Sequence, residues 1–392
     1  MKKLTILFLS IMASISILAG CGKNPDGTAI TPGTTNTPNE VINANDIFGP
    51  SQTDTANQEG DSAVAEDNLP AGYVRSSLTN EPVTENVYLH RPIAIMVPMD
   101  KVAQPQYNIS KAGIVYECLV EGSITRTMCV IEDWQELEKI GNVRSARDYF
   151  IYWMFEWDAI LLHDGGPFYI NNLIAQSTTD NISGRGFRDS SRNAPHNEYY
   201  SADIVNQYIE SNNYTPWHRT EIWDEHHFNF AANGGQTDLT ANYSNAVEVY
   251  TVDLSNCYPV TDSTFKYDPD KNLYYRYIYG EPHMDAATNQ QLAFSNIILQ
   301  NTYGESRDAK DYRIYQCHDT SRDGWFITNG HAIHVTWEKT TDYGATRYYD
   351  DNGNEIELST GKTMICILQD GGSASIDAIF LDSQGNASHP NN

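Results

Sequence analysis

Basic residues are scarce in this chain: its 392 residues include only 25 Lys and Arg against 51 Asp and Glu, a formal net charge of −26. Such an excess of negative charge repels phosphate backbones and anionic lipids, so it argues against nucleic-acid binding and against an electrostatic membrane patch. The chain also lacks the GxSxG, HExxH, P-loop and GxGxxG patterns. The standard signatures of a serine nucleophile, a zinc protease and a nucleotide-binding loop are therefore missing.

The N-terminus has the features of a lipoprotein signal peptide over residues 1–21. Two lysines precede an apolar run from Leu4 to Leu18, which ends in Leu18-Ala19-Gly20-Cys21. The run is too short to span a bilayer comfortably, and small residues before a cysteine form a lipobox. We therefore expect Cys21 to carry a diacylglyceryl lipid, which places the protein on the outer face of the cytoplasmic membrane. A short membrane anchor with an incidental cysteine is the alternative.

Cysteine is also sparse, with six residues of which Cys21 is predicted to be lipidated. The other five have an odd count and no paired spacing, which indicates neither a disulfide framework nor a zinc site. Cys118 and Cys129 lie in apolar runs and are interpreted as core thiols. A disulfide between some pair of the five stays open, because the predicted compartment is oxidising. The five are Cys118, Cys129, Cys257, Cys317 and Cys366.

Residues 22–86 are rich in Thr, Asn, Pro, Gly and acidic residues, and they carry no apolar period that a helix or strand could bury. A segment of this composition buries too little apolar surface to offset the entropy lost on ordering. It is therefore predicted to be a disordered acidic tether that holds the folded part away from an anionic surface.

Residues 87–240 are predicted to form an N-terminal α/β (or α+β) domain. Apolar runs rich in β-branched residues predict strands, and the stretch after the Gly141 turn has the length and apolar periodicity of a helix. A strand–helix–strand order is typical of a crossover unit in an α/β sheet. The predicted elements are strands at Ile93–Val97, Ile114–Val120, Met128–Ile131 and Ala159–Leu162, and a helix at Ser145–Glu156.

Residues 241–385 have the pattern of a mainly antiparallel β domain. Short aromatic or β-branched runs alternate there with turn residues such as Asn329-Gly330 and Asn352-Gly353. Its tyrosines could stack on sugars, although tyrosine is also an ordinary sheet residue. The predicted strands are Val247–Val252, Tyr274–Tyr279, Ile297–Gln300, His331–Trp337, Thr346–Tyr349 and Thr363–Leu368.

Polar clusters follow the apolar runs between Glu121 and Gly166. In open α/β sheets, polar groups just beyond the carboxyl ends of strands line the ligand crevice. Glu121-Gly122 and His163-Asp164-Gly165-Gly166 occupy such positions, and Arg144 stands where the predicted helix begins. The sequence therefore predicts a ligand site at this edge of the sheet.

Arg144 and Arg147 are three residues apart, so they share a face in the first turn of the predicted helix. Two cations at the positive end of a helix are unfavourable, which indicates a compensating anion. One interpretation is an anionic ligand, since guanidinium groups hold carboxylate or phosphate bidentately. The other is an internal salt bridge to Glu117, Glu121 or Asp158.

A second basic segment contains Arg185, Arg188 and Arg192 and ends in Ala194-Pro195-His196-Asn197. If it folds back against the first, the two form one cationic pocket. The alternative is a loop whose arginines pair with Asp189 and Glu198. The candidate ligand-binding residues are Glu121, Arg126, Arg144, Arg147, His163, Asp164, Gly165, Gly166, Arg188, Arg192 and His196.

The stretch Asp224-Glu225-His226-His227 resembles a metal-binding sequence only superficially. Adjacent histidines point in different directions on a helix or strand, so they seldom ligate one ion together. Neither a metal nor a cofactor is predicted.

Short motifs shared with a known family run through the chain. They are Arg91–Met96, Gln104–Gln106, Ile114–Glu117, Val120–Arg126, Ile140–Arg147 and Ala194–Asn197, and further on Asn296–Gln300, Thr336–Lys339, Asp351–Gly353 and Leu358–Gly361. Together they resemble the YerB-type lipoproteins, a bacterial family of unknown function, over essentially the whole chain after the tether. The resemblance implies an N-terminal and a C-terminal family domain. The chain departs from the family pattern at Asn142, usually proline, and at Asp164, which adds a carboxylate near the cationic residues.

Two functional classes fit this pattern. The first is a non-catalytic envelope lipoprotein, anchored through Cys21, that binds an anionic ligand or a partner protein through the N-terminal domain. The second is an envelope enzyme acting on a phosphorylated or glycosidic cell-wall polymer precursor, because clustered arginines with His163 and Asp164 could hold a pyrophosphate and move a proton. A similarity of layout to the LytR-CpsA-Psr phosphotransferases supports the second class by analogy alone. Binding is the preferred interpretation, since no activated nucleophile is visible.

Overall fold

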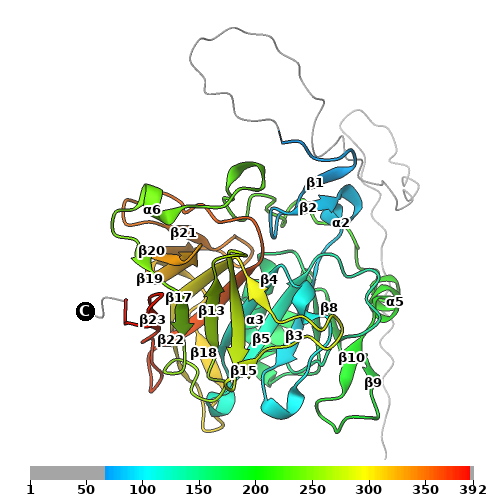
Figure 1. Ribbon diagram of the computed structural model, residues 1–392. Coiled ribbons are helices and arrows are strands. Elements are labelled where there is room, and N and C mark those ends of the chain that lie inside the picture. Colours follow the sequence, from blue (N-terminus) through cyan, green and yellow to red (C-terminus); the bar gives the residue numbers. More distant parts are fainter. Residues whose placement is uncertain (1–66, 389–392) are drawn as a thin grey trace, which may run out of the picture. The chain divides into compact units, whose positions relative to one another are not determined.

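A mixed sheet of twelve strands forms the centre of the structure, a computed structural model that describes residues 67–388 (Figure 1). Its strands are β3 (Ile93–Pro98), β4 (Ile114–Leu119), β5 (Thr125–Ile131), β7 (Ile160–His163), β8 (Asn181–Ser183), β11 (Val247–Glu248), β17 (Asn296–Ser306), β18 (Arg313–Tyr315), β19 (Asp319–Thr328), β20 (His331–Lys339), β21 (Arg347–Tyr349) and β22 (Thr363–Asp370). The order across the sheet is β11-β20-β19-β17-β22-β4-β5-β3-β7-β8, with β18 beside β17 and β21 beside β20.

Strand direction distinguishes the two parts of this sheet. β17, β22 and β4 run parallel, as do β3, β7 and β8, whereas β5 lies antiparallel between β4 and β3. The pairs β17–β19, β19–β20, β20–β11 and β20–β21 are antiparallel. The predicted class, an α/β part followed by a mainly antiparallel β part, is confirmed. The two parts share one sheet, because β22 pairs with β4 from Thr363↔Ile114 to Ile367↔Cys118.

A second sheet of six strands lies against one face of the first. It consists of β12 (Thr251–Asp253), β13 (Thr264–Asp268), β14 (Leu273–Ile278), β15 (Glu281–Pro282), β16 (Ala293–Phe294) and β23 (Ile379–Leu381), in the order β15-β14-β13-β12-β23 with β16 beside β14. Two small sheets pair β1 (Tyr73–Arg75) with β2 (Pro82–Thr84), and β6 (Ile140–Gly141) and β9 (Phe187–Arg188) with β10 (Glu198–Tyr200). The α-helices are α2 (Glu85–Leu89), α3 (Asp148–Phe155), α4 (Asn171–Ile174), α5 (Ala202–Asn212) and α6 (Leu239–Asn242).

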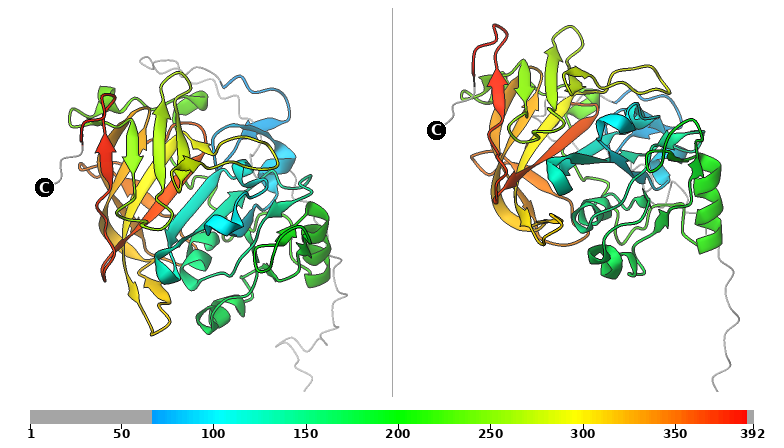
Figure 2. Two further views of the ribbon diagram at one scale, coloured as in Figure 1. Left: turned by 60° about the horizontal axis from the view of Figure 1, so that its bottom comes forward. Right: turned by 90° about the horizontal axis from the view of Figure 1, so that it is seen from below.

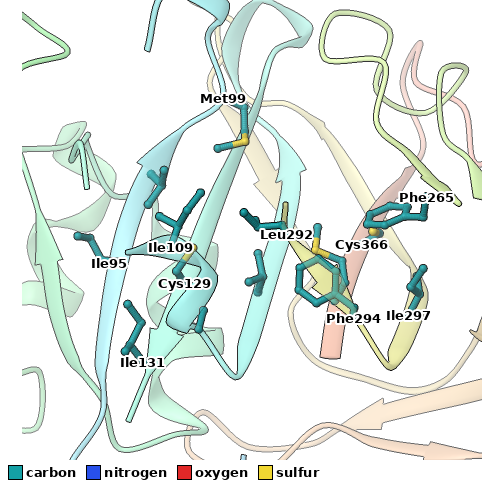
Figure 3. Packing of buried hydrophobic residues seen from close by; sticks show 14 of the residues in the cluster. Ile95, Met99, Ile109, Cys129, Ile131, Phe265, Leu292, Phe294, Ile297 and Cys366 are labelled. Atoms are coloured by element: carbon teal, nitrogen blue, oxygen red, sulfur yellow. The ribbon is translucent and has the colours of Figure 1, made fainter. Parts of the chain in front are cut away.

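The apolar core lies on both faces of the large sheet, because the side chains of each strand alternate between the two faces. On one face, residues such as Ile95, Cys129 and Ile297 pack toward Phe265 and Phe294 of the six-stranded sheet (Figure 3). Helix α5 also packs on this face, at the end farthest from the C-terminal strands (Figure 2). On the opposite face, α3 buries its aromatic side chains against the sheet. Strands covered on both sides explain the nearly continuous apolar runs in the sequence.

Helix α3 begins later than predicted, at Asp148 instead of Ser145, and it ends at Phe155. Arg147 is its N-cap residue and has an extended backbone, with φ −131° and ψ 155°. The preceding residues are drawn away from the helix because the Ala146 amide donates to the Gly165 carbonyl at 3.0 Å. Arg144 and Arg147 therefore do not share a helical first turn, and the prediction that they lie on one helix face is wrong.

The end of the predicted tether is folded. Most of residues 22–86, and the predicted signal peptide with Cys21, lie outside the described residues. In the described part of this segment, β1 and β2 form a hairpin, and Leu78 is buried at 2% exposure. Side-chain hydrogen bonds fix this segment, such as those from Ser76 to Glu132 (2.6 Å) and from the Asn80 amide to the Ala231 carbonyl (2.9 Å). The prediction of disorder is therefore wrong for residues 73–86. The sequence gives no sign of this fold, because hydrogen bonds and one buried leucine produce no apolar period.

The cysteines at positions 118, 129, 257, 317 and 366 are free and buried. The interpretation of Cys118 and Cys129 as core thiols is confirmed, since both belong to the apolar clusters. Within residues 67–388, no helix has the length and apolar content needed to cross a membrane.

Candidate functional site

The candidate site lies at the edge of the large sheet where β3, β4, β7 and β8 end. These strands point the same way, so the residues that follow them meet at one edge. β5 runs in the opposite direction and begins there, which places its second residue, Arg126, beside Pro98 at the end of β3. Strand direction thus brings the segments after Leu119 and His163 to the edge that contains Arg126.

Arg144 connects two of these segments through its backbone. Its amide donates to the Met96 carbonyl at 2.9 Å, and its carbonyl accepts from the Asp164 amide at 3.1 Å. The side chain has no hydrogen bond or ion pair to any residue within 67–388, and its Nε is buried without a partner. A fixed backbone therefore supports a guanidinium group that forms no ion pair within residues 67–388.

Arg126 lies close to Arg144 and is 3% exposed. Its Nη1 donates to the Ser145 carbonyl at 2.6 Å, whereas its Nε is buried without a partner. The pKa of Arg126 is lowered to about 10: burial is the main cause, the positive charges of Arg147 and Arg144 act in the same direction, and Glu121 opposes the change. A lowered arginine pKa with these causes indicates a site that is partly shielded from water and carries an excess of positive charge.

Arg147 is neutralised inside the protein. Its Nε and Nη2 donate to the Glu121 carboxylate at 2.7 and 2.5 Å, and its Nη1 donates to the Ala146 carbonyl at 2.7 Å. The guanidinium also lies 5.4 Å from the centre of the Tyr312 ring. For this residue the structure contains the internal salt bridge, with Glu121 as the carboxylate.

Two loops add further unpaired polar atoms beside Arg126 and Arg144. The Nδ1 of His196 is buried without a partner within residues 67–388. Burial lowers the pKa of this imidazole, the charge of Asp100 opposes the change, and the charges of Arg144, Arg192 and Arg126 lower the pKa as well. Asn142 is fully buried and donates to the carbonyls of Ala103 and His196, but its Oδ1 has no partner. The Nε2 of Gln104 is also buried and unpaired. Buried polar atoms are rarely left unpaired, so this concentration indicates a place that holds water or a ligand.

A carboxyl pair flanks the cationic residues. Arg188 bonds Asp164 at 3.0 Å and lies 2.6 Å from Glu198, and the Gly186 amide donates to Glu198 at 2.9 Å. The pKa of Glu198 is raised to about 7: burial is the main cause and the neighbouring Asp164 carboxyl acts in the same direction, while the Gly186 amide and Arg188 oppose the change. The pair therefore holds a proton near neutral pH. The pairing of Arg188 with Glu198 was the predicted alternative to a pocket role, whereas Asp189 instead pairs with Lys139 at 2.7 Å.

The other predicted residues support the loops. His163 bonds the Gly165 carbonyl at 2.8 Å and Asn181 at 3.2 Å. Gly166 has no room for a side chain, since a Cβ would lie 2.3 Å from Ile170. Arg192 donates to the carbonyls of Pro105 and Gln104, both at 2.8 Å, and so fixes the loop that contains Gln104.

Of the predicted residues, the structure thus brings together Arg126, Arg144 and His196, while the side chains of Arg147, His163 and Arg192 are engaged in internal bonds. Gln104, Asn142 and Glu198 also lie at the site, although the sequence pattern did not predict them as ligand-binding residues. Asn142 stands two residues before Arg144 in a recognised motif, and this proximity was the available signal.

The histidines considered as metal ligands lie on opposite sides of the chain. The His226 side chain is 87% exposed, whereas His227 is buried and stacks on Trp157 with ring centres 3.7 Å apart. Among residues 67–388, no group of three or more His, Cys, Asp and Glu side chains is arranged to hold a metal ion.

The fold and its edge site define a two-part architecture, in which an α/β part and a β part share one sheet. Residues 78–215 match the N-terminal domain, and residues 252–365 the C-terminal domain, of the protein family of unknown function DUF3048. The chain belongs to this family. It is 26% identical over 309 residues to "Putative lipoprotein YerB" of Bacillus subtilis, covering 77% of this chain and 88% of the relative. The crystal structure of YerB from Bacillus subtilis aligns with a TM-score of 0.64 at 25% identity, over 77% of this chain and 99% of that one.

Proposed function

We propose that this protein is a lipid-anchored lipoprotein on the outer face of the cytoplasmic membrane, and that it binds an anionic envelope ligand through Arg144, Arg126 and His196. The lipobox ending at Cys21 supports the anchoring, as does the name of the Bacillus subtilis relative. The ligand class follows from the unpaired donors. The same edge could instead receive an anionic group of a partner protein.

The observation that carries the proposal is the unpaired guanidinium of Arg144 beside the buried Arg126. Burying a charge without a partner costs several kcal/mol, so a half-buried arginine normally has a carboxylate. Glu121, a carboxylate beside this cluster, is already bonded to Arg147. A phosphate or pyrophosphate would supply the missing negative charge and accept hydrogen bonds from both Nε groups.

Titration of the purified protein with pyrophosphate by calorimetry tests the proposal. Arg144→Ala should weaken binding by roughly 1.5–3 kcal/mol, the usual contribution of a hydrogen bond to a charged group. Arg185→Ala is the matched control, because Arg185 is an exposed arginine of the same basic segment with no contact to Arg144 or Arg126. Equal affinities in both variants, or no binding by the wild type, would refute the proposed ligand class.

A second candidate function is catalysis on a phosphorylated or glycosidic polymer precursor. The Asp164–Glu198 pair favours it, because a carboxyl with a pKa of about 7 can act as a general acid or base at neutral pH. Its test is turnover of a lipid-linked or nucleotide-linked sugar phosphate by the wild type and by Glu198→Gln. Turnover abolished by this change would support the enzyme. Absence of turnover in a protein that binds pyrophosphate would leave binding as the function.

A further inference from the structure

A pocket lies at the opposite edge of the large sheet from the arginine cluster, where β4 and β22 begin. It has a volume of about 460 Å³ and is enclosed by segments of both sheets and of the β1–β2 hairpin. Its lining includes Ile109, Tyr275, Gln291, Phe294, Ser295 and Lys362. This volume is within the range of pockets that hold small organic molecules. The pocket is separate from the arginine cluster, which lies at the opposite edge, where β3, β4, β7 and β8 end.

Lys362 is held rigidly in this pocket. Its carbonyl accepts from the amides of Ser295 and Asn296 at 3.0 and 3.1 Å. Gly361 precedes it with a φ of +125°, and a Cβ at that position would lie 2.1 Å from the Ser295 hydroxyl, so only glycine fits. The backbone that presents the lysine is therefore fixed before any ligand arrives.

The Lys362 ammonium is incompletely paired. Its Nζ donates to the Ser110 carbonyl, and it forms no ion pair with any carboxylate within residues 67–388. An ammonium has three donors, so two remain available to a ligand. Burial lowers the pKa of Lys362, with Glu81 and Asp285 opposing the change. A neutralising partner inside the pocket would relieve this burial cost.

The walls around the lysine are apolar on one side and polar at the rim. Ile109, Leu292 and Phe294 continue the core cluster between the two sheets and are at most 3% exposed (Figure 3). Gln290, Gln291 and Ser295 add hydrogen-bonding groups. Glu81 lines the same pocket, so its negative charge opposes a second negative charge on a ligand. A monoanion with an apolar body fits these features, whereas a phosphate dianion does not.

We propose that this pocket binds the carboxylate of a small molecule with an apolar or aromatic body, with the carboxylate paired to Lys362 and the apolar body against Phe294 and Ile109. This ligand is distinct from the phosphate-type anion proposed for the arginine cluster, and the two sites are independent.

Calorimetry of the purified full chain with 3-phenylpropionate, and with its uncharged amide, tests the proposal. The carboxylate should bind at least about tenfold more tightly than the amide, the lower end of the effect of one charge-assisted hydrogen bond. This comparison uses the wild type alone, so it does not depend on the folding of any variant. Equal affinities for the two compounds, or no binding of the carboxylate up to about 10 mM, would overturn the proposal.

Single-residue variants test whether Lys362 is the group that pairs with the carboxylate of the ligand. Lys362→Met should lose about tenfold or more in affinity for 3-phenylpropionate and should retain the affinity for the amide. Lys310→Met is the matched control, because Lys310 is an exposed lysine at the opposite edge of the sheet. Glu81→Gln should strengthen binding of the carboxylate, since it removes the nearby negative charge. Unchanged binding in Lys362→Met, or weaker binding in Glu81→Gln, would contradict the assignment. Arg144→Ala should have no effect on this ligand, which separates the two sites.

Discussion

Replacing Arg144 and Arg147 separately by alanine distinguishes an arginine that binds a ligand from an arginine that stabilises the fold. The Arg144 side chain donates no hydrogen bond to any residue of 67–388 and lies near the buried Arg126. Arg144→Ala therefore removes like-charge repulsion and no protein bond. The free energy of unfolding should decrease by no more than about 0.5 kcal/mol, the usual range for a side chain without such bonds, and removal of the unpaired charge acts to increase it.

Arg147→Ala should behave differently, because it leaves the Glu121 carboxylate without its partner. The two side chains are 8% and 24% exposed, and breaking a buried ion pair typically costs 3–5 kcal/mol. The partial exposure of Glu121 places the expected loss near the lower limit, at about 3 kcal/mol. Adding Glu121→Gln to Arg147→Ala should recover part of this loss, since it removes the stranded charge.

The assay is urea unfolding followed by tryptophan fluorescence, in a buffer without phosphate or other multivalent anions. Under these conditions no ligand contributes to the stability of either variant. A loss of several kcal/mol in Arg144→Ala would show that its side chain stabilises the fold, and the reasoning for an anion site would fail. A negligible loss in Arg147→Ala would refute the assigned role of its salt bridge.

Three further predictions follow from other contacts. Glu198 has a pKa raised from 4.5 to about 7, so the folded state holds the proton more tightly, and the free energy of unfolding should fall as pH rises from about 4.5 to 7. Glu198→Gln should lack this part of the pH dependence. The pKa of Glu132 is also raised to about 7, so the quantity to measure is the difference in unfolding free energy between the wild type and Glu198→Gln across this pH range. The fully buried Glu117–Arg276 pair, at 2.7 Å, joins β4 to the six-stranded sheet, so Glu117→Gln should cost about 3–5 kcal/mol in urea unfolding; a loss below about 1 kcal/mol would show that the pair is dispensable. Cys21→Ala should release the protein from the membrane fraction of cells, and unchanged fractionation of this variant would refute the lipobox interpretation.

Much of the fold could be predicted because buried strands leave a strong signal. The strands β3, β4 and β7 are buried along their whole length and mostly apolar, since both faces of the sheet are covered. The rule that polar residues follow strand ends placed Glu121 and His163 at one edge correctly. By contrast, β19 begins with the polar stretch Asp319-Thr320-Ser321-Arg322 and has no apolar run there, so the sequence analysis missed it.

The pairing of distant elements could not be predicted, because it depends on contacts that no local pattern contains. β22 joins β4 across more than two hundred residues, and the hairpin before Arg91 folds through hydrogen bonds to Glu132 and Ala231. The sequence also could not show which of three carboxylates, Glu117, Glu121 or Asp158, pairs with Arg147. Glu117 is instead bonded to Arg276, and Asp158 to Arg219, both from later segments of the chain.

At the candidate site, too, some residues could be predicted from the sequence and others could not. Arg126, Arg144 and His196 could be proposed because cations are unusual in so acidic a chain. Gln104 and Asn142 could not, since amide side chains in loops are common and only the folded loops reveal that their polar atoms are buried without partners.

The most direct measurement is a crystal structure of the protein soaked with pyrophosphate. The account predicts an anion held between Arg126 and Arg144, with phosphate oxygens about 2.7–2.9 Å from both Nε atoms and within reach of His196. The pair of Arg147 and Glu121 should remain intact. An anion bound elsewhere, or a site that stays empty at concentrations that bind in solution, would contradict the assignment of this arginine cluster as the ligand site.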